Sequence, residues 1–292
     1  MKQLTQLAVV ALKPFGEAKL RLGGVLSDER RAALAHRMAT HVITTANSVL
    51  PTAVVSRDHD VLAMAESLGA IPIPERVRPG LQVGGLNEAL DDATDFAHDC
   101  GAKLLVILAG DLPLLSADDV SALVRLPGLP GLVVARDHAG TGTNALAMSP
   151  PGATAHQFGP GSLHAHRRRA LLSGLPVVTL DRSGLCRDID TPDDLDWVIS
   201  SGALSVIDRE LYRPDADVVG SPPTHEPRPD VESAPTAPAP AEAPVAGAVA
   251  SDAAREDALP GPGELPEHAI GPRVGRLGKR LRKPAAPDRQ GQ

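Results

Sequence analysis

Short apolar runs alternate along this chain with longer segments in which apolar residues recur every three or four positions. A continuous apolar run is typical of a strand buried on both faces, and the helical spacing is typical of a helix that packs one face on a sheet. The predicted strands are residues 7–12, 53–56, 71–73, 104–109, 131–135 and 177–180. The predicted helices are residues 61–68, 86–97, 117–124 and 163–172, preceded by a long helix that begins near Asp28 with Ser27 as its N-cap.

This alternation predicts the fold class, a three-layer α/β/α sandwich around a mostly parallel sheet. Loops that follow predicted strands are residues 13–24, 74–85, 111–113 and 136–144. In a parallel sheet the carboxyl ends of the strands lie at one edge, and ligands bind there. We therefore expect these loops to border a single crevice.

Two glycine-rich segments, Gly140-Thr-Gly-Thr-Asn144 and Phe158-Gly-Pro-Gly-Ser-Leu-His164, combine glycines with hydroxyls and have few carboxylates near them. Glycine lets the backbone approach a ligand closely, and hydroxyls donate without adding charge, so both segments suit a phosphate or carboxylate group. The alternative is that they are plain turns. The first segment also matches the dinucleotide fingerprint G-x-G-x-x-A. That fingerprint must open a helix after the first strand, whereas Ser149-Pro-Pro-Gly152 stops any helix here.

Three cations occur within nine residues of the loop that leaves the first predicted strand: Lys13, Lys19 and Arg21. Lysine offers a point charge and arginine a bidentate fork, so the loop is suited to clamp a triphosphate. The alternative is a solvated surface loop. The chain lacks the pattern G-x-x-x-x-G-K-[ST], which excludes a P-loop NTPase.

Carboxylates follow the fourth and the last predicted strands. Asp111 stands at the end of the strongest apolar run, although a turn former there would also explain it. The acids of Thr191-Pro-Asp-Asp194 are explained by a helix start, whereas Asp188 and Asp190 are not, and their alternation puts both on one face of an extended segment. Together with Asp111 they are candidate ligands of Mg²⁺, a hard ion that takes one or two carboxylates plus phosphate oxygens.

Histidines 164 and 166 flank the second glycine-rich segment, and we expect them to reinforce an anion site. The arginines at 167 and 168 beside them fit a solvated helix face better. No Ser-His-Asp arrangement points to a hydrolase. A cationic loop, separated carboxylates and an anion pocket instead suit nucleotidyl transfer, which depends on positioning and charge neutralisation. An acceptor phosphate is already ionised near pH 7, so this reaction requires no general base.

Composition divides the chain in two. Of the 292 residues 42% are hydrophobic, enough for a sizeable core, but residues 214–292 hold fifteen of the 28 prolines and no Phe, Tyr, Trp or Cys. Such a segment lacks the apolar mass to offset the entropy of ordering. We therefore predict a folded domain over residues 1–213 and a disordered tail over 214–292. Residues 273–283 carry six cations and no acid, which suits contact with a polyanion, a membrane surface or a partner, or simply a solvated end.

Charge and cysteine content narrow the function further. The net charge of −7 gives no global basic field for nucleic acid. Cys100 and Cys186 have no paired spacing, which is consistent with a reducing cytoplasm. The apolar run at residues 7–12 is too short for a signal peptide or a membrane span, so we expect a cytoplasmic protein.

Six motifs occur in a fixed order, and together they resemble one known family. They are Leu12-Lys-Pro-Phe with Ala18-Lys-Leu-Arg-Leu22, Ser27-x-x-Arg30, Gly110-Asp-Leu-Pro113, Gly140-Thr-Gly-Thr-Asn144, Phe158-Gly-Pro-Gly-Ser162 and Asp188-Ile-Asp-Thr-Pro192. The set resembles the CofC/FbiD family of phospholactate and phosphoenolpyruvate guanylyltransferases, which act in the biosynthesis of the deazaflavin coenzyme F-420. The resemblance covers about residues 5–200 and implies a fold like that of the nucleotide-diphospho-sugar transferases, with GTP as co-substrate and Mg²⁺ as cofactor.

The resemblance also implies roles for particular residues. The implied acceptor-binding residues are Thr143, Gly159 and Ser162, and the implied metal ligands are Asp111, Asp188 and, as a further candidate, Asp190. The implied triphosphate-binding residues are Lys13, Lys19 and Arg21, which with Asp111 form the predicted catalytic set. Asn87 stands where related enzymes contact the nucleotide near the base. The family acceptor is phosphoenolpyruvate in the mycobacterial type and 2-phospho-L-lactate in the archaeal type.

Two hypotheses of different classes follow. The first is an enzyme that transfers GMP from GTP to phosphoenolpyruvate, or alternatively to 2-phospho-L-lactate or another three-carbon phospho-acid. The Ala, Arg, Pro and Gly bias, typical of a GC-rich genome, favours phosphoenolpyruvate. The second is a non-catalytic α/β module that presents the tail to a partner. The sequence leaves open whether the chain forms a homodimer.

Overall fold

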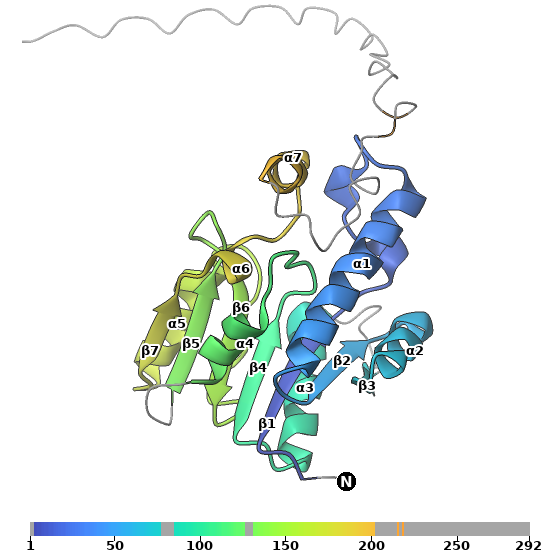
Figure 1. The fold of residues 1–292 in the computed structure, drawn as a ribbon. Coiled ribbons are helices and arrows are strands. Elements are labelled where there is room, and N and C mark those ends of the chain that lie inside the picture. The colour runs from blue at the N-terminus through green and yellow to red at the C-terminus, as the bar shows by residue number, and fades with distance from the viewer. Residues whose placement is uncertain (1–2, 77–84, 126–130, 202–214, 216–217, 219–292) are drawn as a thin grey trace, which may run out of the picture. The chain divides into compact units, whose positions relative to one another are not determined.

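Seven strands form one sheet in the order β3-β2-β1-β4-β6-β5-β7 (Figure 1). The computed structural model describes residues 3–76, 85–125, 131–201, 215 and 218. The strands are β1 (Gln6–Ala11), β2 (Thr52–Ser56), β3 (Ile71–Pro74), β4 (Leu104–Leu108), β5 (Gly131–Arg136), β6 (Thr143–Ser149) and β7 (Val177–Leu180). The six strands predicted from continuous apolar runs are therefore all present.

The strand β6 is absent from the sequence prediction. It pairs antiparallel with both β4 and β5, whereas the β1–β2, β1–β4, β2–β3 and β5–β7 pairs are parallel. From the sequence we expected only that residues 145–148 do not continue into a helix. The element does end at the prolines that follow, but it is a strand. Because β6 runs against its neighbours, its first residue, Thr143, lies at the edge where β4 ends. The first glycine-rich segment is the tight connection from β5 into β6.

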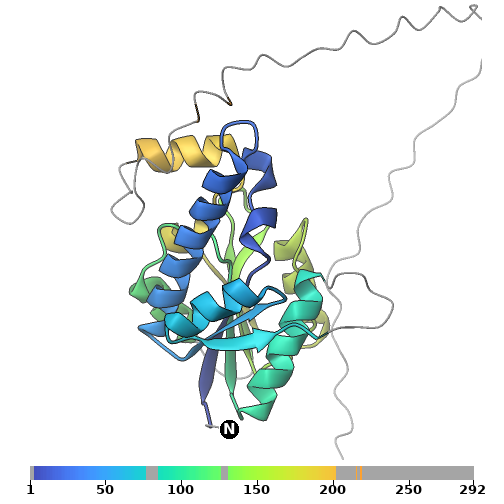
Figure 2. The same cartoon turned by 90° about the vertical axis from the view of Figure 1, so that its right-hand side faces the viewer.

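Helices cover both faces of the sheet, as the sequence predicted. They are α1 (Asp28–Asn47), α2 (His59–Ser67), α3 (Leu86–Asp99), α4 (Ala117–Val124), α5 (Ser162–Leu172), α6 (Ser183–Cys186) and α7 (Pro192–Ser200). One core cluster joins the sheet to α1, α2, α4 and α6, and a second joins the other face to α3 and α5. Figure 2 shows α1 and α3 on opposite sides of the strands. The three-layer architecture is thus confirmed.

Alternating side chains of the central strands divide between these two clusters. In β1, Ala8 and Val10 face the α1 side, whereas Leu7 and Val9 face the α3 side, and all four are fully buried. Because such a strand is buried on both faces, none of its side chains faces water, and this explains the continuous apolar run. The polar residues that follow such a strand are therefore the first that can serve a ligand.

A third apolar cluster lies away from the sheet and fixes the cationic loop. It joins the end of that loop (Leu22 and Leu26) to the first half of α1, to α7 and to Ile189. Ile189 is fully buried and stands between Asp188 and Asp190. The cluster therefore holds the acidic segment 188–190 against the loop that carries the lysines.

The helix starts agree with the predictions. Thr191 caps α7 through a capping box with Asp194, as expected from the sequence. Ser27 occupies the predicted N-cap position of α1, although its side chain makes no capping hydrogen bond to the helix. Instead the carboxylate of Asp215 accepts a 2.8 Å hydrogen bond from the Ser27 N–H and pairs with Arg30.

The described residues all fall within one compact unit, Met1–Pro229. The predicted tail 214–292 and its basic end lie outside the described residues, apart from Asp215 and Val218, so the predicted boundary near residue 213 stays a prediction. Part of the predicted loop 74–85 is also outside them. Among the helices described, none is long and apolar enough to cross a membrane.

Candidate active site at the carboxyl edge of the sheet

Two adjoining pockets lie where the central strands end. The smaller has a volume of about 170 Å³ and the larger about 410 Å³. Both are bordered by the last residue of β1 and by residues that follow β1 and β4, namely Ala11, Leu12, Lys13, Gly110 and Asp111. The crevice predicted from strand-following loops is therefore present, and it has two compartments. Gly110 allows the close approach of these two segments, since a Cβ there would overlap the side chain of Leu12.

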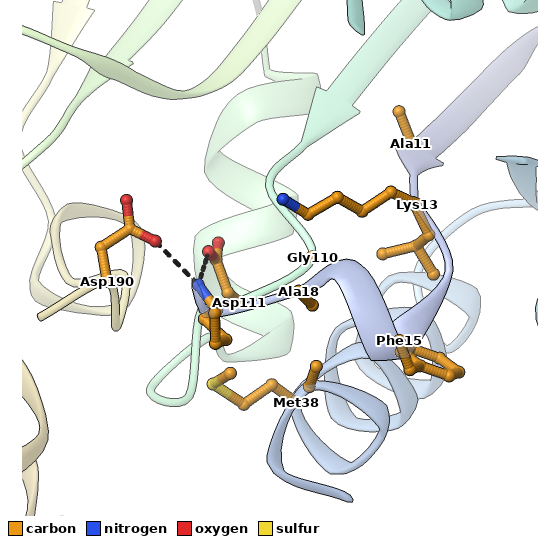
Figure 3. A pocket seen from close by; sticks show the side chains of 11 residues that line it. Ala11, Lys13, Phe15, Ala18, Met38, Gly110, Asp111 and Asp190 are labelled. Carbon is orange, nitrogen blue, oxygen red and sulfur yellow. Dashed lines mark hydrogen bonds and ion pairs between the residues drawn. The ribbon is translucent and has the colours of Figure 1, made fainter. Parts of the chain in front are cut away.

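Lys19 lines the smaller pocket. Its ammonium group donates to Asp111 and, at 2.9 Å, to Asp190, and only 7% of its side chain is exposed. Figure 3 shows these two contacts as dashed lines, with Lys13 reaching into the pocket from the end of β1. Lys19 is the one described non-glycine residue with a positive φ, 54°. A left-handed backbone is unfavourable for lysine, so the ion pairs hold it there at a cost in strain.

Charges dominate the titration of this group. Burial lowers the pKa of Lys19, but the negative charges of Asp111 and Asp190 and the hydrogen bonds to them raise it by more, so the net pKa lies above the ordinary lysine value. Burial raises the pKa of Asp190, yet the charge and hydrogen bond of Lys19 lower it by more. Lys19 is therefore a fixed positive charge at neutral pH, held beside carboxylates.

Asp188 completes an acidic cluster. Asp111, Asp188 and Asp190 each offer a carboxylate oxygen, and these oxygens all lie within 4.8 Å of one another. Burial, and then the charge of Asp111, raise the pKa of Asp188, while a 3.2 Å hydrogen bond from Asn144 opposes the increase. Oxygen ligands at this separation suit a hard divalent cation. The structure thus brings together the three carboxylates that the sequence singled out.

Arg31 is a buried residue near the site that the sequence reasoning missed. It stands on the buried face of α1, is only 4% exposed, and donates a 2.7 Å hydrogen bond to the carbonyl oxygen of Ala18, directly before Lys19. It also pairs with Asp28. A signal was available, because Arg31 falls at helical spacing with the apolar residues Leu34 and Met38. A cation on an apolar stripe is usually buried with a partner.

The other cations of the loop are placed differently. Lys13 borders both pockets, so it can reach a ligand in either. Arg21 has 75% of its side chain exposed and lies 3.8 Å from Asp190, at the rim of the site. Of the three predicted triphosphate-binding cations, the structure therefore places Lys13 and Lys19 in the crevice and leaves Arg21 at its edge.

The larger pocket is bordered by Thr143, the first residue of β6, and by Phe158 from the second glycine-rich segment. The Thr143 hydroxyl is 3.1 Å from Nδ1 of His166. Burial, and then the charge of His156, lower the pKa of His166 to about 4. His166 is fully buried at the wall of this pocket, whereas His164 is exposed, and the prediction that the two histidines reinforce an anion site stays a prediction.

Asn87 contacts the backbone of the second glycine-rich segment. Its Nδ2 donates to the Phe158 carbonyl at 3.1 Å, and its Oδ1 accepts from the Phe158 N–H at 2.9 Å. Both halves of the amide are therefore used to hold Phe158 at the wall of the larger pocket. The sequence prediction put this residue beside the nucleotide base, and in the structure its described contacts are with the loop.

Gly159 and Ser162 follow Phe158 at the start of α5. Gly159 has a φ of 134°, which strongly favours glycine, and open space surrounds its Cα where a side chain would stand. Ser162 is buried and its N–H donates to the Gly159 carbonyl at 3.1 Å. Neither is among the described residues that border the two pockets, so of the predicted acceptor-binding residues the structure brings only Thr143 directly to the crevice.

A mostly parallel sheet that gathers carboxylates and lysines around one crevice at its carboxyl edge is the arrangement expected of the nucleotidyltransferase class of α/β proteins. The same fold is found in a protein from Desulfovibrio desulfuricans described as a nucleotide-diphospho-sugar transferase, with a TM-score of 0.59 at 15% identity over 73% of this chain and 93% of that one. Within this class, the chain belongs to the family of CofC-like guanylyl transferases, whose family model matches residues 6–209.

Relatives in this family are similar over nearly their whole length. The phosphoenolpyruvate guanylyltransferase of Sphaerobacter thermophilus is 39% identical over 196 residues, which are 66% of this chain and 92% of the relative. That of Rubrobacter xylanophilus is 38% identical, over 71% and 97%. The 2-phospho-L-lactate guanylyltransferase of Methanothermobacter thermautotrophicus is 33% identical, over 67% and 84%. The family resemblance read from the ordered motifs is thereby confirmed.

Proposed function

We propose that this protein transfers GMP from GTP to phosphoenolpyruvate, forming enolpyruvyl-2-diphospho-5'-guanosine and pyrophosphate in coenzyme F-420 biosynthesis. A phosphate oxygen of the acceptor forms a bond to the α-phosphorus of GTP, and the bond from that phosphorus to the bridging oxygen of pyrophosphate breaks. The observation that carries the proposal is the meeting of Lys13, Lys19 and the acidic cluster at one crevice. Relatives named for this reaction support it.

The acidic cluster is the proposed metal site. Asp111, Asp188 and Asp190 are three oxygen donors within reach of one ion, a donor set that fits Mg²⁺. When bound, the ion neutralises charge on the phosphates that react. The proposal assigns this role to the carboxylates because Lys19 alone compensates only part of their negative charge.

The chain's own cations bind the triphosphate in this proposal. Lys13 and Lys19 offer positive charge in the crevice, and Arg21 at the rim meets the more exposed phosphates. The larger pocket, with about 410 Å³, falls in the range of about 300–1,000 Å³ typical of small-molecule sites. Thr143, Gly159 and Ser162 are the proposed acceptor-binding residues, with Thr143 supplying a hydroxyl at the wall of that pocket. Asn87 supports the same wall through Phe158.

The acceptor is the finer part of the proposal. Phosphoenolpyruvate and 2-phospho-L-lactate share a carboxylate and a phosphate and differ in saturation of the three-carbon skeleton. Of the three relatives described above, the two more similar ones are named for phosphoenolpyruvate and the third for 2-phospho-L-lactate. Together with the compositional bias of the sequence, this supports phosphoenolpyruvate. A reaction that consumes GTP also supports the predicted cytoplasmic location.

Pyrophosphate release tests the proposal. The protein is incubated with GTP, Mg²⁺ and each acceptor in turn, with ATP in place of GTP as the nucleotide control. We expect release with GTP and phosphoenolpyruvate and little with 2-phospho-L-lactate. Release only with 2-phospho-L-lactate would overturn the acceptor and keep the reaction. No release with either acceptor would overturn the enzyme, and a thermal shift with GTP and Mg²⁺ would then point to the binding module.

A further inference from the structure

His166 and Thr143 form a buried side-chain pair at the wall of the larger pocket. Nδ1 of His166 lies 3.1 Å from the Thr143 hydroxyl, and Nε2 accepts a 3.0 Å hydrogen bond from the backbone N–H of Gln157. His166 is fully buried and Thr143 is 8% exposed. Both ring nitrogens of His166 therefore have a defined partner.

The partner of Nε2 decides the tautomer of the ring. A backbone N–H can only donate, so Nε2 of His166 must accept and carries no hydrogen. A neutral imidazole holds one N–H, which must then be at Nδ1. The lowered pKa of His166, about 4, agrees with a neutral ring, since protonation would set Nε2–H against the Gln157 N–H.

The tautomer in turn decides the role of the Thr143 hydroxyl. A hydroxyl has one hydrogen to donate and two lone pairs that accept. The hydrogen on Nδ1 is shared between the Thr143 oxygen and the Ser162 backbone, and a protonated Nδ1 has no lone pair to accept from the hydroxyl, so the hydroxyl hydrogen has to point elsewhere. Within the described part of the chain, His166 is the partner of this hydroxyl, and Thr143 borders the larger pocket.

We propose that His166 is a positioning residue that turns the Thr143 hydroxyl into an obligate donor aimed at the negatively charged acceptor in the larger pocket. This rests on the proposed function, because it takes the acceptor to be a phospho-acid. A hydroxyl that cannot donate to His166 is free to donate to an anion. It does not have to break a hydrogen bond to the protein or rotate when the anion binds. A neutral ring provides this without a permanent positive charge.

Packing around the ring supports a fixed orientation. Phe158 meets His166 edge-on, with the ring centroids 4.8 Å apart, and the Asn87 side chain is hydrogen-bonded to the backbone of Phe158. The N–H of Leu163 donates to the Thr141 carbonyl at 3.1 Å, which ties the start of α5 to the loop before Thr143. Both glycine-rich segments are thus joined through the helix that carries His166.

Steady-state kinetics of four variants test the proposal. Thr143→Val removes the hydroxyl and His166→Phe removes the Nδ1–H while it keeps a ring against Phe158. We expect each to lower kcat/KM for the acceptor about 10- to 100-fold, the effect of losing one hydrogen bond to a charged group, with KM for GTP unchanged. His166→Asn offers an amide N–H near the Nδ1 position and should recover part of the loss. His156→Phe, the same change at a buried histidine paired with Thr94, is the control and should leave kcat/KM for the acceptor unchanged.

The double variant Thr143→Val with His166→Phe separates positioning from a structural role. If both changes remove the same donated hydrogen bond, kcat/KM for the acceptor falls no further in the double variant than in either single variant. Losses that multiply, or a normal kcat/KM in His166→Phe, would overturn the proposal. If the wild-type protein releases no pyrophosphate at all, the proposed function has failed instead.

Nuclear magnetic resonance gives a readout that needs no turnover. The ¹⁵N shifts of the His166 ring in the wild-type protein should report a neutral Nδ1–H tautomer from pH 6 to pH 8. A neutral Nε2–H tautomer would overturn the proposal even if His166→Phe fails to fold.

Discussion

Asp111→Asn tests the acidic cluster with the smallest possible change of shape. The substitution replaces one charged oxygen by an amide and leaves the carbonyl oxygen as an acceptor. Asp111 is 23% exposed on its side chain and pairs with Lys19, which keeps Asp190 as its second partner. The variant therefore weakens an ion-pair network and removes one of three proposed metal ligands.

The contacts of Asp111 predict a modest loss of stability for Asp111→Asn. Removing one partner of a buried pair costs about 3–5 kcal/mol when the other charge is left alone. Here Lys19 keeps Asp190, the amide oxygen still accepts, and the charge that raises the pKa of Asp188 is removed. We expect a loss of about 1–2 kcal/mol, which lowers Tm by about 2–8 °C for a domain of this size.

The cost in turnover is large in comparison. Loss of a residue that only supports a metal ligand costs about 10- to 100-fold in affinity or activity. Asp111 is a proposed ligand and also anchors Lys19, so we expect turnover to fall at least about 100-fold. Pyrophosphate release from GTP and phosphoenolpyruvate measures it, and circular dichroism melting measures the fold.

The matched control is Asp193→Asn, the same change at an exposed carboxylate in the first turn of α7. It should leave turnover unchanged and alter stability by less than about 1 kcal/mol, the size of a helix-end charge effect. If Asp111→Asn turned over at the wild-type rate, the acidic cluster would not be the reactive centre. A variant that lost turnover only because it unfolded would show in the melting curve.

Three further predictions concern Lys19, Asn87 and His166. Lys19→Met leaves two carboxylates without their ammonium partner, so it should lower the free energy of unfolding by about 2–4 kcal/mol. Mg²⁺ should raise the Tm of this variant more than that of the wild type. A Tm that does not change with Mg²⁺ would contradict the metal site. Asn87→Ala removes two hydrogen bonds to Phe158 and should lower the free energy of unfolding, measured in urea, by about 1–3 kcal/mol. Asn87→Asp keeps the acceptor, so its stability should lie between those of the wild type and Asn87→Ala. Equal stability of the wild type and both variants would refute the contact. The pKa of His166 falls from 6.5 to about 4 on folding, so the unfolded chain binds more protons between these values. Stability present at pH 7 is then lost as the pH falls from 6.5 towards 4, by about 3 kcal/mol in the limit, and a pH profile that is the same in His166→Phe would contradict this.

The sequence predicted the layers of this fold because burial on two faces leaves a local signature. The runs that became β1 and β4 are apolar at nearly every position, and the helices that flank them repeat at helical spacing. The strand β6 was missed although its residues 145–148 form a continuous apolar run. It begins with two polar side chains that are buried, at 8% and 5% exposure, and it stands between a glycine-rich turn and two prolines. These neighbours made the short apolar run look like part of a loop.

Much of the candidate site was also accessible from the sequence, since the residues at strand ends share an edge once the sheet is parallel. That rule alone puts Lys13, Asp111 and the segment 188–190 at one crevice. The role of His166 was not accessible in this way. A histidine beside arginines reads as a cation, and only burial and the Gln157 N–H make it neutral.

From the sequence alone follow the layers of the fold, six of the seven strands and the chemistry available at their ends. Local periodicity carries that information because it reports which faces of an element avoid water. The packed structure was needed to show that Lys19 contacts partners 92 and 171 residues away, and that β6 brings Thr143 to the crevice. Contacts of that range depend on how whole elements pack, and no local pattern encodes them.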